Sequence, residues 1–146
     1  MRRAIAIVVA LSALGSLSAA QAEDRIVVEA TGFRSDRGHL RCFLFDAPDA
    51  YPTHPERAVA TSRGVISRGA ARCSFDGVAP GTYAIALHHD EDDDGQMDTG
   101  IFGIPTEGTG ASRDARGSMG PPSFRDAHVS YPGGEQVQRI RIGYVF

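Results

Sequence analysis

The order of apolar and polar positions indicates short β-strands separated by turns. Residues 25–31 and 39–45 are rich in β-branched and aromatic side chains and flank a Ser, Asp and Gly segment, so they predict an opening hairpin. The second run is apolar at nearly every position, which indicates a central strand covered on both faces. Two short strands are expected at 64–67 and 70–75, joined at Arg68-Gly69.

The next strand is expected after Pro80-Gly81. This pair suits a tight turn in which proline fixes the first corner and glycine takes the left-handed second corner. Beyond the turn, Tyr83, Ile85 and Leu87 alternate with smaller residues, so they share one buried face of a strand.

The segment from Thr99 to Phe124 is rich in Gly and Pro and carries no helix or strand pattern. Because it is much longer than the usual connection of about 4 to 6 residues, it is either a working loop or disordered. An ordered loop is favoured by five apolar residues that could anchor it. These are Ile101, Phe102, Ile104, Met119 and Phe124.

Two more strands are expected at 127–131 and 136–146. The last strand would bury Ile140, Ile142, Tyr144 and Phe146 on one face. The whole pattern predicts an all-β fold, an antiparallel β-sandwich of about seven strands with one long glycine-rich loop.

The first 22 residues predict a secretory signal peptide, with a basic start, a short apolar centre and small residues ending at Ala22. An uncleaved membrane anchor is the alternative, but the apolar run is shorter than the roughly 20 residues a bilayer requires. Residues 23–146 then form a single secreted or periplasmic domain with no membrane insertion after cleavage. Its 13 basic and 18 acidic side chains argue against nucleic acid or anionic lipid as a partner.

The two cysteines, Cys42 and Cys73, predict a disulfide, because an exported chain meets an oxidising compartment. A ring of this length is worth roughly 3 to 4 kcal/mol in the chain-entropy model. Two buried free thiols are the alternative.

The most informative stretch is the acidic loop, defined here as residues 90–98, of which six are acidic. Alternate carboxylates, a glycine at position 6 and a backbone carbonyl at position 7 form the pattern of a calcium loop. Hard oxygen ligands favour calcium over zinc or copper. The candidate metal ligands are Asp90, Asp92, Asp94, Gln96 and Asp98.

The calcium pattern departs from an EF-hand at position 12, where Ile101 replaces the bidentate glutamate, and no amphipathic helix flanks the loop. The loop is closer to the calcium loops of extracellular β-proteins and thrombospondin-type repeats, and Glu107 is the candidate for the missing ligand. The alternative is a solvated acidic hairpin tip. Against it, carboxylates about 6 Å apart repel by roughly 0.7 kcal/mol per pair even in water.

His88 and His89 are neighbours at a strand end and should point to opposite faces. His89 could hydrogen-bond a loop carboxylate and orient it. No serine or cysteine lies in the setting of a catalytic nucleophile. The alternative to a non-enzymatic module is therefore a metal-dependent hydrolase that uses His89, Asp90 and Glu107.

Two resemblances bear on these expectations. The pattern from Phe75 to Tyr83 resembles one in prealbumin-like and carboxypeptidase-regulatory-type sandwiches. Residues 80–129 resemble a family of small exported bacterial proteins known only as a domain of unknown function. The motifs are Gly81-Thr-Tyr-Ala, His89-Asp90 to Asp98, Gly103-Ile-Pro-Thr-Glu-Gly108, Arg116-Gly117 and Gly120-Pro-Pro-Ser-Phe124-Arg-Asp-Ala127.

The family resemblance implies a secreted β-sandwich without an assigned activity. It also implies that Ile104, Pro105, Glu107, Phe124 and Asp126 act together with the acidic loop. We therefore expect an exported Ig-like or prealbumin-like module, stabilised by calcium, that serves in binding or in envelope structure. Its expected partner is an envelope protein, a peptide or a glycan.

Overall fold

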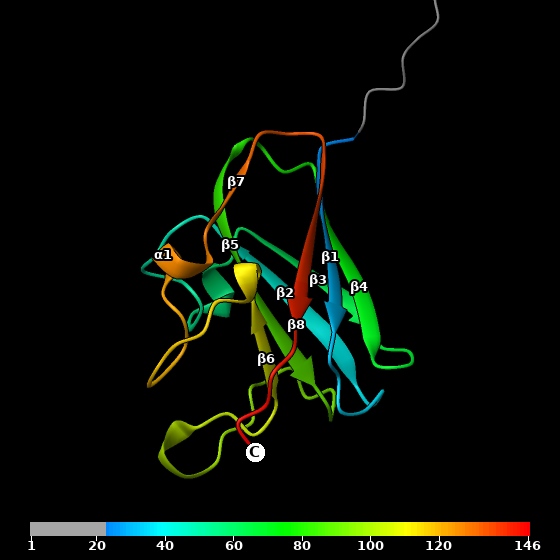
Figure 1. Ribbon diagram of the computed structural model, residues 1–146, viewed down its shortest axis with the longest axis vertical. Helices are drawn as coiled ribbons and strands as arrows, with labels where there is room; N and C mark the ends of the chain where they lie inside the picture. The colour runs from blue at the N-terminus through cyan, green and yellow to red at the C-terminus, as the bar shows by residue number, and fades with distance from the viewer. Residues whose placement is uncertain (1–22) are drawn as a thin grey trace, which may run out of the picture.

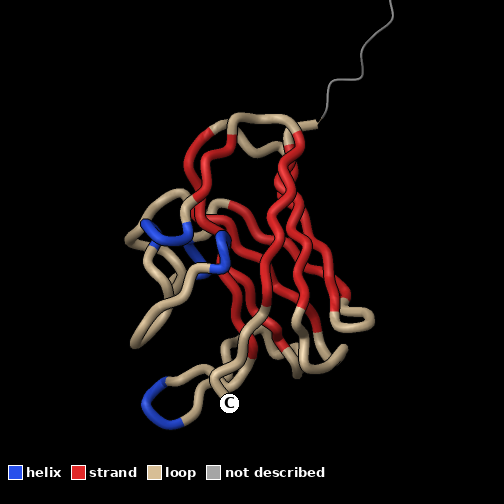
Figure 2. Tube along the Cα trace, in the orientation of Figure 1, coloured by secondary structure: helices blue, strands red, loops and turns tan. Residues whose placement is uncertain are grey.

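The computed structural model describes residues 23–146, which form two β-sheets packed face to face (Figure 1). Strands make up most of the regular structure, and the helical pieces are short (Figure 2). The elements are β1 (Arg25–Thr31), β2 (His39–Phe45), β3 (Ala60–Val65), β4 (Ala70–Asp76), β5 (Gly81–Asp90), β6 (Gly108–Ala111), α1 (Phe124–Ala127), β7 (Val129–Tyr131) and β8 (Glu135–Arg141), with 3-10 turns at Pro55–Arg57, Ile101–Gly103 and Ser112–Asp114.

The smaller sheet has the strand order β4-β1-β8, and the larger sheet has the order β3-β2-β5-β6 with β7 paired to the start of β5. Every ladder is antiparallel except that of β1 with β8, which is parallel. The predicted all-β sandwich is confirmed, with eight strands in the described residues instead of about seven.

The core lies on both faces of the larger sheet. One cluster fills the space between the sheets and includes Leu40, Leu44 and Ile85. A second cluster covers the outer face and includes Phe43 and Phe45. Successive residues of a strand point to opposite faces, so the two clusters explain why β2 is apolar at nearly every position.

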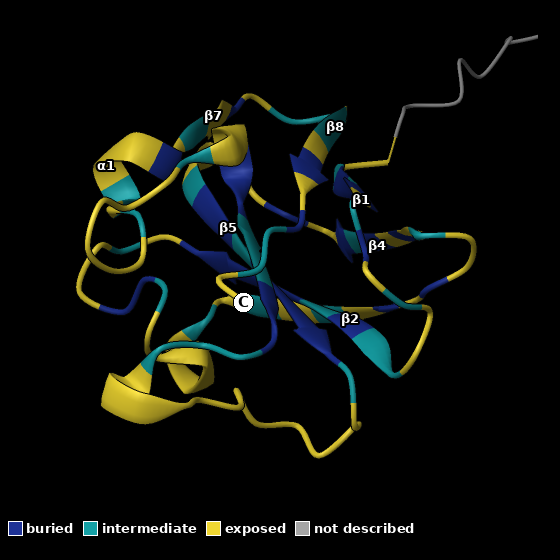
Figure 3. Cartoon of the chain, turned by 60° about the horizontal axis from the view of Figure 1, so that its bottom comes forward, coloured by how far each residue is buried: buried dark blue, intermediate teal, exposed yellow. Residues whose placement is uncertain are grey.

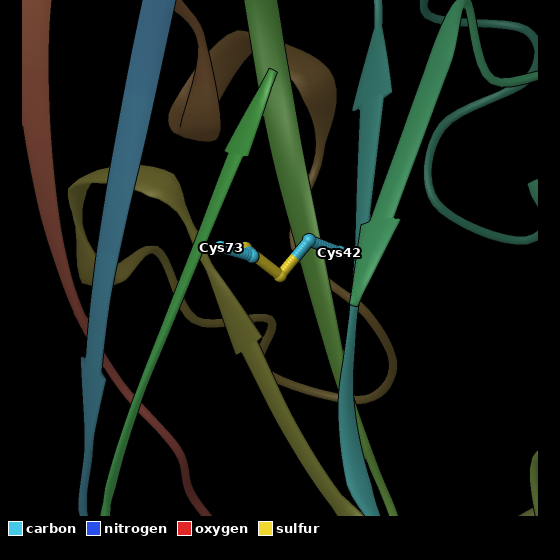
Figure 4. The surroundings of a disulfide bond; sticks show 2 residues. All are labelled: Cys42 and Cys73. Carbon is cyan, nitrogen blue, oxygen red and sulfur yellow. A yellow bond between two sulfur atoms is a disulfide. The ribbon is translucent and has the colours of Figure 1, made fainter. Parts of the chain in front are cut away.

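A disulfide between Cys42 on β2 and Cys73 on β4 joins the two sheets through the core (Figure 4). The predicted pairing is therefore confirmed, and the alternative of free thiols is wrong because both cysteines of the chain are bonded.

The predicted opening hairpin is wrong, because β1 pairs with β4 and β8 while β2 pairs with β3 and β5. The strand expected at 64–67 is also shifted, since β3 covers Ala60–Val65 and lies in the other sheet from β4. In both cases the connection crosses between the layers instead of returning along one sheet. This crossing lets strands of both sheets contribute to the apolar cluster between them.

The strand after Pro80-Gly81 is confirmed, as is the shared face of Ile85 and Leu87. The left-handed glycine is misplaced, however: Gly77 has the positive φ of +68°, and Gly81 is already the first residue of β5. The chain bends at Gly77, directly after β4, and again at Pro80, before β5 begins at Gly81.

The glycine-rich segment contains a strand, β6, that its amino-acid composition does not predict. β6 pairs with β5 and packs closely against the chain after β8. A Cβ atom on Gly108 would lie 2.5 Å from the Tyr144 ring and 2.6 Å from Ile142. Glycine is required there for close packing, so its presence does not indicate a loose chain.

Several predicted anchors face solvent. Ile101, Phe102 and Met119 are exposed, and so is Phe146, which the strand pattern places on a buried face with Ile140 and Ile142. β8 ends at Arg141, so the alternation that buries Ile140 does not extend to the last residues. The predicted signal peptide lies outside the described residues.

Candidate metal site at the acidic loop

β5 carries the start of the acidic loop to one end of the larger sheet. Asp90 is the last residue of β5 and is only 1% exposed. It pairs with His39 on β2, and the adjacent Gly38 approaches so closely that a Cβ atom there would overlap the Asp90 carbonyl. In Figure 3, β5 is buried over much of its length, whereas the loop that follows it, residues 92–103, is exposed.

β6 places Glu107 beside Asp90. The ladder pairs His89 with Gly108, so its next position sets Glu107 opposite Asp90 on the same face. The Glu107 carboxylate accepts hydrogen bonds from His88 Nε2 at 2.5 Å, the Glu91 amide at 2.7 Å and the Asp98 amide at 3.2 Å. Burial raises the pKa of Glu107, but these hydrogen bonds outweigh it, so the net pKa is lowered.

Asp90 is less well satisfied. Its Oδ2 atom accepts a hydrogen bond from the Gly95 amide at 3.0 Å, but its Oδ1 atom is buried and has no hydrogen-bond partner in the described residues. One oxygen each from Asp90, Asp92 and Glu107 lie within 4.8 Å of one another. Such a group could hold a metal ion, because two oxygens that each lie about 2.4 Å from one calcium ion are at most about 4.8 Å apart.

A second carboxylate group overlaps the first. Oxygens of Asp92, Asp94 and Asp98 also lie within 4.8 Å of one another, and all three residues are exposed. Partial loss of hydration and the charges of Asp92, Glu107 and Asp94 raise the pKa of Asp98. Because Asp92 belongs to both groups, the structure brings together the side chains of Asp90, Asp92, Asp94, Asp98 and Glu107 from the predicted set.

Gln96 is the remaining predicted ligand. Its backbone N–H donates to Asp94 Oδ1 at 2.7 Å, as the Asp94 N–H does to Asp92 Oδ1 at 3.2 Å. These two hydrogen bonds close consecutive turns of the loop. The role of the Gln96 carbonyl as a ligand stays a prediction.

Protein cations neutralise the acidic residues that lie between these carboxylates. Arg34 binds Glu91 through two hydrogen bonds of 2.6 and 3.1 Å, and this contact raises the pKa of Arg34 and lowers that of Glu91. Asp93 contacts His39 Nδ1 at 2.6 Å and Arg63 at 3.2 Å. Within residues 23–146, Asp90, Asp92, Asp94 and Asp98 have no such ion pair.

These basic partners were absent from the expected site. Arg41 also donates to the Gly95 carbonyl and holds the loop against β2. The sequence does contain a pattern that indicates some of them: His39 and Arg41 alternate on β2 and so share one face. Arg63, the cross-strand neighbour of Arg41, lies on the same face. The strand prediction alone could not supply the pairing of β2 with β3.

His88 and His89 occupy opposite faces of β5. His88 contacts the cluster carboxylate Glu107, whereas His89 lies inside the sandwich. His89 Nε2 donates to the Arg37 carbonyl at 2.8 Å, and its Nδ1 accepts from the Tyr144 hydroxyl at 2.6 Å. The position beside the metal-site carboxylates that was expected for His89 is therefore occupied by His88. The loop carboxylate nearest to His89 in an ion pair is that of Glu91, whose Oε1 atom lies 3.5 Å from His89 Nδ1.

Residues 28–139 match the family described as "Uncharacterized protein conserved in bacteria (DUF2141)". The chain belongs to this family. Neither a curated protein nor a solved structure matches the chain.

Only part of the residue group implied by the resemblance meets the acidic loop in this DUF2141 domain. The Gly100 amide donates to the Ile104 carbonyl, and Pro105 bridges to Thr99, so both adjoin the loop. Phe124 and Asp126 belong to α1, beside the opposite half of β5 (Figure 1). There Ser123 and Asp126 cap the helix.

The disulfide of this DUF2141 domain points to an oxidising, exported compartment. None of the helices in residues 23–146 is long and apolar enough to span a bilayer.

The geometry offers the hydrolase alternative little support. It requires His89 to act with Asp90 and Glu107, but both ring nitrogens of His89 are hydrogen-bonded inside the core. A hollow of 240 Å³ on the outer face is lined instead by Arg41, Phe43, Thr61, Ser62 and Arg63.

Proposed function

We propose that this domain is an exported, calcium-stabilised β-sandwich module that serves in binding or in envelope structure. The observation that carries the proposal concerns Asp90, which belongs to a three-carboxylate group and whose buried Oδ1 atom has no hydrogen-bond partner in the described residues. A buried charged oxygen without a partner costs at least about 1 to 3 kcal/mol. A cation bound to it would remove this cost.

The pattern of neutralised charges also supports a bound cation. Within the acidic loop, the second and fourth residues are paired with basic side chains, whereas the first, third, fifth and ninth have no such pair in residues 23–146. A loop whose acids served only for solubility would have no reason to divide them in this way. The unpaired carboxylates are those that a calcium loop uses as ligands.

Calcium fits the donor chemistry better than zinc or copper. The two groups consist of carboxylate oxygens and include no histidine, and Nε2 of the neighbouring His88 is already hydrogen-bonded to Glu107. Calcium accepts six to eight oxygen ligands in flexible geometry, so water and backbone carbonyls, including that of Gln96, would complete the shell. The ion would join the acidic loop to the chain at Glu107.

In this proposal the family motifs have a common role. The motif from His89 to Asp98 supplies the carboxylates, and the motif from Gly103 to Gly108 supplies Glu107 and the turn before it. The proposal also retains the expected Ig-like or prealbumin-like arrangement as the type of sandwich.

Calorimetric titration of residues 23–146 with calcium tests the proposal. We expect binding, and at a free calcium concentration of one hundred times Kd a rise in melting temperature of roughly 10 °C. Asp90→Asn should abolish both effects, because it removes the buried charge from the group.

Asp93→Asn is the matched control. It removes the same charge from the same loop, but Asp93 contacts His39 and Arg63 and belongs to neither carboxylate group. Asparagine also tolerates the left-handed conformation of this position, where φ is 61°. The Asp93→Asn variant should bind calcium as the unmutated domain does. If the unmutated domain gives no heat of binding in the titration and no thermal shift, the proposal is refuted.

A further inference from the structure

The loop between Asp98 and Glu107 presents two large apolar side chains to solvent. Ile101 is 79% exposed and Phe102 is 95% exposed, and both belong to the single turn Ile101–Gly103. This turn projects away from the sheets at the lower end of the molecule in Figure 1. Scattered exposed apolar residues are ordinary, but two adjacent ones at the tip of a projecting loop suggest a contact surface.

The loop tip is ordered by its own hydrogen bonds. The Thr106 amide donates to the Asp98 carbonyl at 2.9 Å, and the Gly100 amide donates to the Ile104 carbonyl at 2.8 Å. Phe102 has a φ of 62°, a left-handed conformation that is strained for a bulky residue. The backbone at Phe102 therefore has a conformation that bulky residues avoid.

The base of the tip is the candidate metal site. Asp98 and Glu107 stand at its two ends, and each belongs to one of the two carboxylate groups. A calcium ion bound there would fix the direction in which the tip projects. It would also reduce the negative charge of Asp92, Asp94 and Asp98, which are exposed at the same end.

We propose that, when calcium is bound, the tip docks on an anionic phospholipid surface, with Ile101 and Phe102 entering the boundary between headgroups and acyl chains. The inference rests on the proposed calcium site. The ion would complete its oxygen shell with lipid phosphate at the exposed carboxylates. Without calcium, the excess of acidic residues in the domain repels such a surface, so the contact is conditional on the ion.

The shape of the tip favours a lipid surface over a protein partner. A stable protein interface buries about 800 Å² on each side, which requires some 20 residues. The tip is a narrow projection whose apolar part is essentially two side chains. Two such side chains suffice for shallow insertion into a bilayer, where binding scales with the apolar area buried and with electrostatic attraction.

A tryptophan probe tests the docking directly, because the chain contains no tryptophan. Phe102→Trp should show a blue-shifted emission with vesicles of phosphatidylcholine and phosphatidylserine in the presence of calcium. The shift should be absent with EGTA and with vesicles of phosphatidylcholine alone. Val65→Trp is the control, since Val65 is 74% exposed but lies on β3, and its emission should not shift.

Sedimentation with the same vesicles measures the contribution of the tip. Ile101→Ser and Phe102→Asn should each weaken calcium-dependent binding about tenfold, because each removes the burial of one large apolar side chain. Neither residue is a candidate ligand, so both variants should retain the thermal shift produced by calcium. Asp90→Asn should lose both the shift and the vesicle binding.

The outcomes separate the two proposals. If calcium produces no thermal shift, the calcium site is refuted and this inference with it. If calcium stabilises the domain but the emission of the Phe102→Trp variant is unchanged by vesicles, or changes equally in EGTA, only the docking is refuted. A calcium-dependent dimer in light scattering that Phe102→Asn abolishes would identify a second copy as the occupant and would also overturn the lipid surface.

Discussion

At the level of single residues, the number of hydrogen-bond donors that reach a carboxylate decides how well its charged form is stabilised. Glu107 has three donors and Asp36 has two backbone amides, whereas Asp90 has one donor and a bare oxygen within the described part of the chain. A carboxylate with several donors is stable as an anion without an ion beside it. This difference singles out Asp90 among these three carboxylates.

The pKa of Asp36 tests, away from the candidate metal site, whether backbone donors stabilise a carboxylate as an anion. Its carboxylate accepts the Gly69 amide at 2.8 Å and the Arg68 amide at 2.7 Å, and these bonds lower its pKa from 3.8, outweighing burial. Since the folded pKa lies below the unfolded one, the contribution of Asp36 to stability is present above about pH 4 and is lost as the pH falls through the folded pKa.

An NMR titration of the Asp36 carboxyl carbon should give a midpoint below 3.8. Asp36→Asn should melt at a lower temperature at neutral pH, and its melting temperature should depend less on pH in the acid range. A midpoint at or above 3.8 would show that the two amide bonds do not form in solution.

Sequence alone identified most carboxylates of the candidate site but not the balance of charge around them. Asp90 and Asp92 follow from the alternation of carboxylates in the loop, and Glu107 follows from the lack of a glutamate at position 12 of the calcium pattern. Arg34 and Arg63 reach the loop from sequence separations of 57 and 30 residues, which no local pattern encodes. The repulsion expected within the loop is therefore partly relieved by the fold itself.

At the level of secondary structure, β6 is the element that completes the site, and it is also the least visible in the sequence. The sequence predicts β1 and β2 with their observed bounds because their β-branched and aromatic runs end at turn residues. β6 has the sequence Gly-Thr-Gly-Ala, which has low strand propensity. It is a strand because β5 offers a free edge and because glycine permits close contact with Tyr144 and Ile142.

Gly108→Ala should therefore destabilise the domain by about 1 to 3 kcal/mol, the usual cost of overpacking. The added methyl group would overlap the Tyr144 ring and Ile142, and it would displace Glu107, the preceding residue. Urea unfolding gives the stability, and the affinity for calcium should fall in the same variant.

Gly120→Ala is the control for this substitution. A Cβ atom on Gly120 would meet nothing within 4 Å, so the change in stability should remain within about 0.5 kcal/mol. Equal effects of the two substitutions would mean that glycine at 108 serves chain flexibility and not packing.

For the whole molecule, the disulfide joins the two layers that the chain crosses repeatedly. β1 and β2 are consecutive yet lie in different sheets, as do β3 and β4, so the fold depends on contacts that are distant in sequence. Cys42 and Cys73, 31 residues apart, link β2 to β4 through the core. The bond lowers the conformational entropy of the unfolded chain, so less entropy is lost when the two sheets pack together.

Reduction of the disulfide should lower the free energy of unfolding by about 3 to 4 kcal/mol, the chain-entropy value for a ring of this size. Urea unfolding with and without a reducing agent measures the difference. The candidate metal site contains neither cysteine, so reduced protein that is still folded should bind calcium with unchanged affinity. The reduced protein could instead keep its native circular dichroism and lose calcium binding. That result would show that the acidic loop depends on the spacing of the two sheets. The site would then depend on the sandwich as a whole and not on the β5–β6 edge alone.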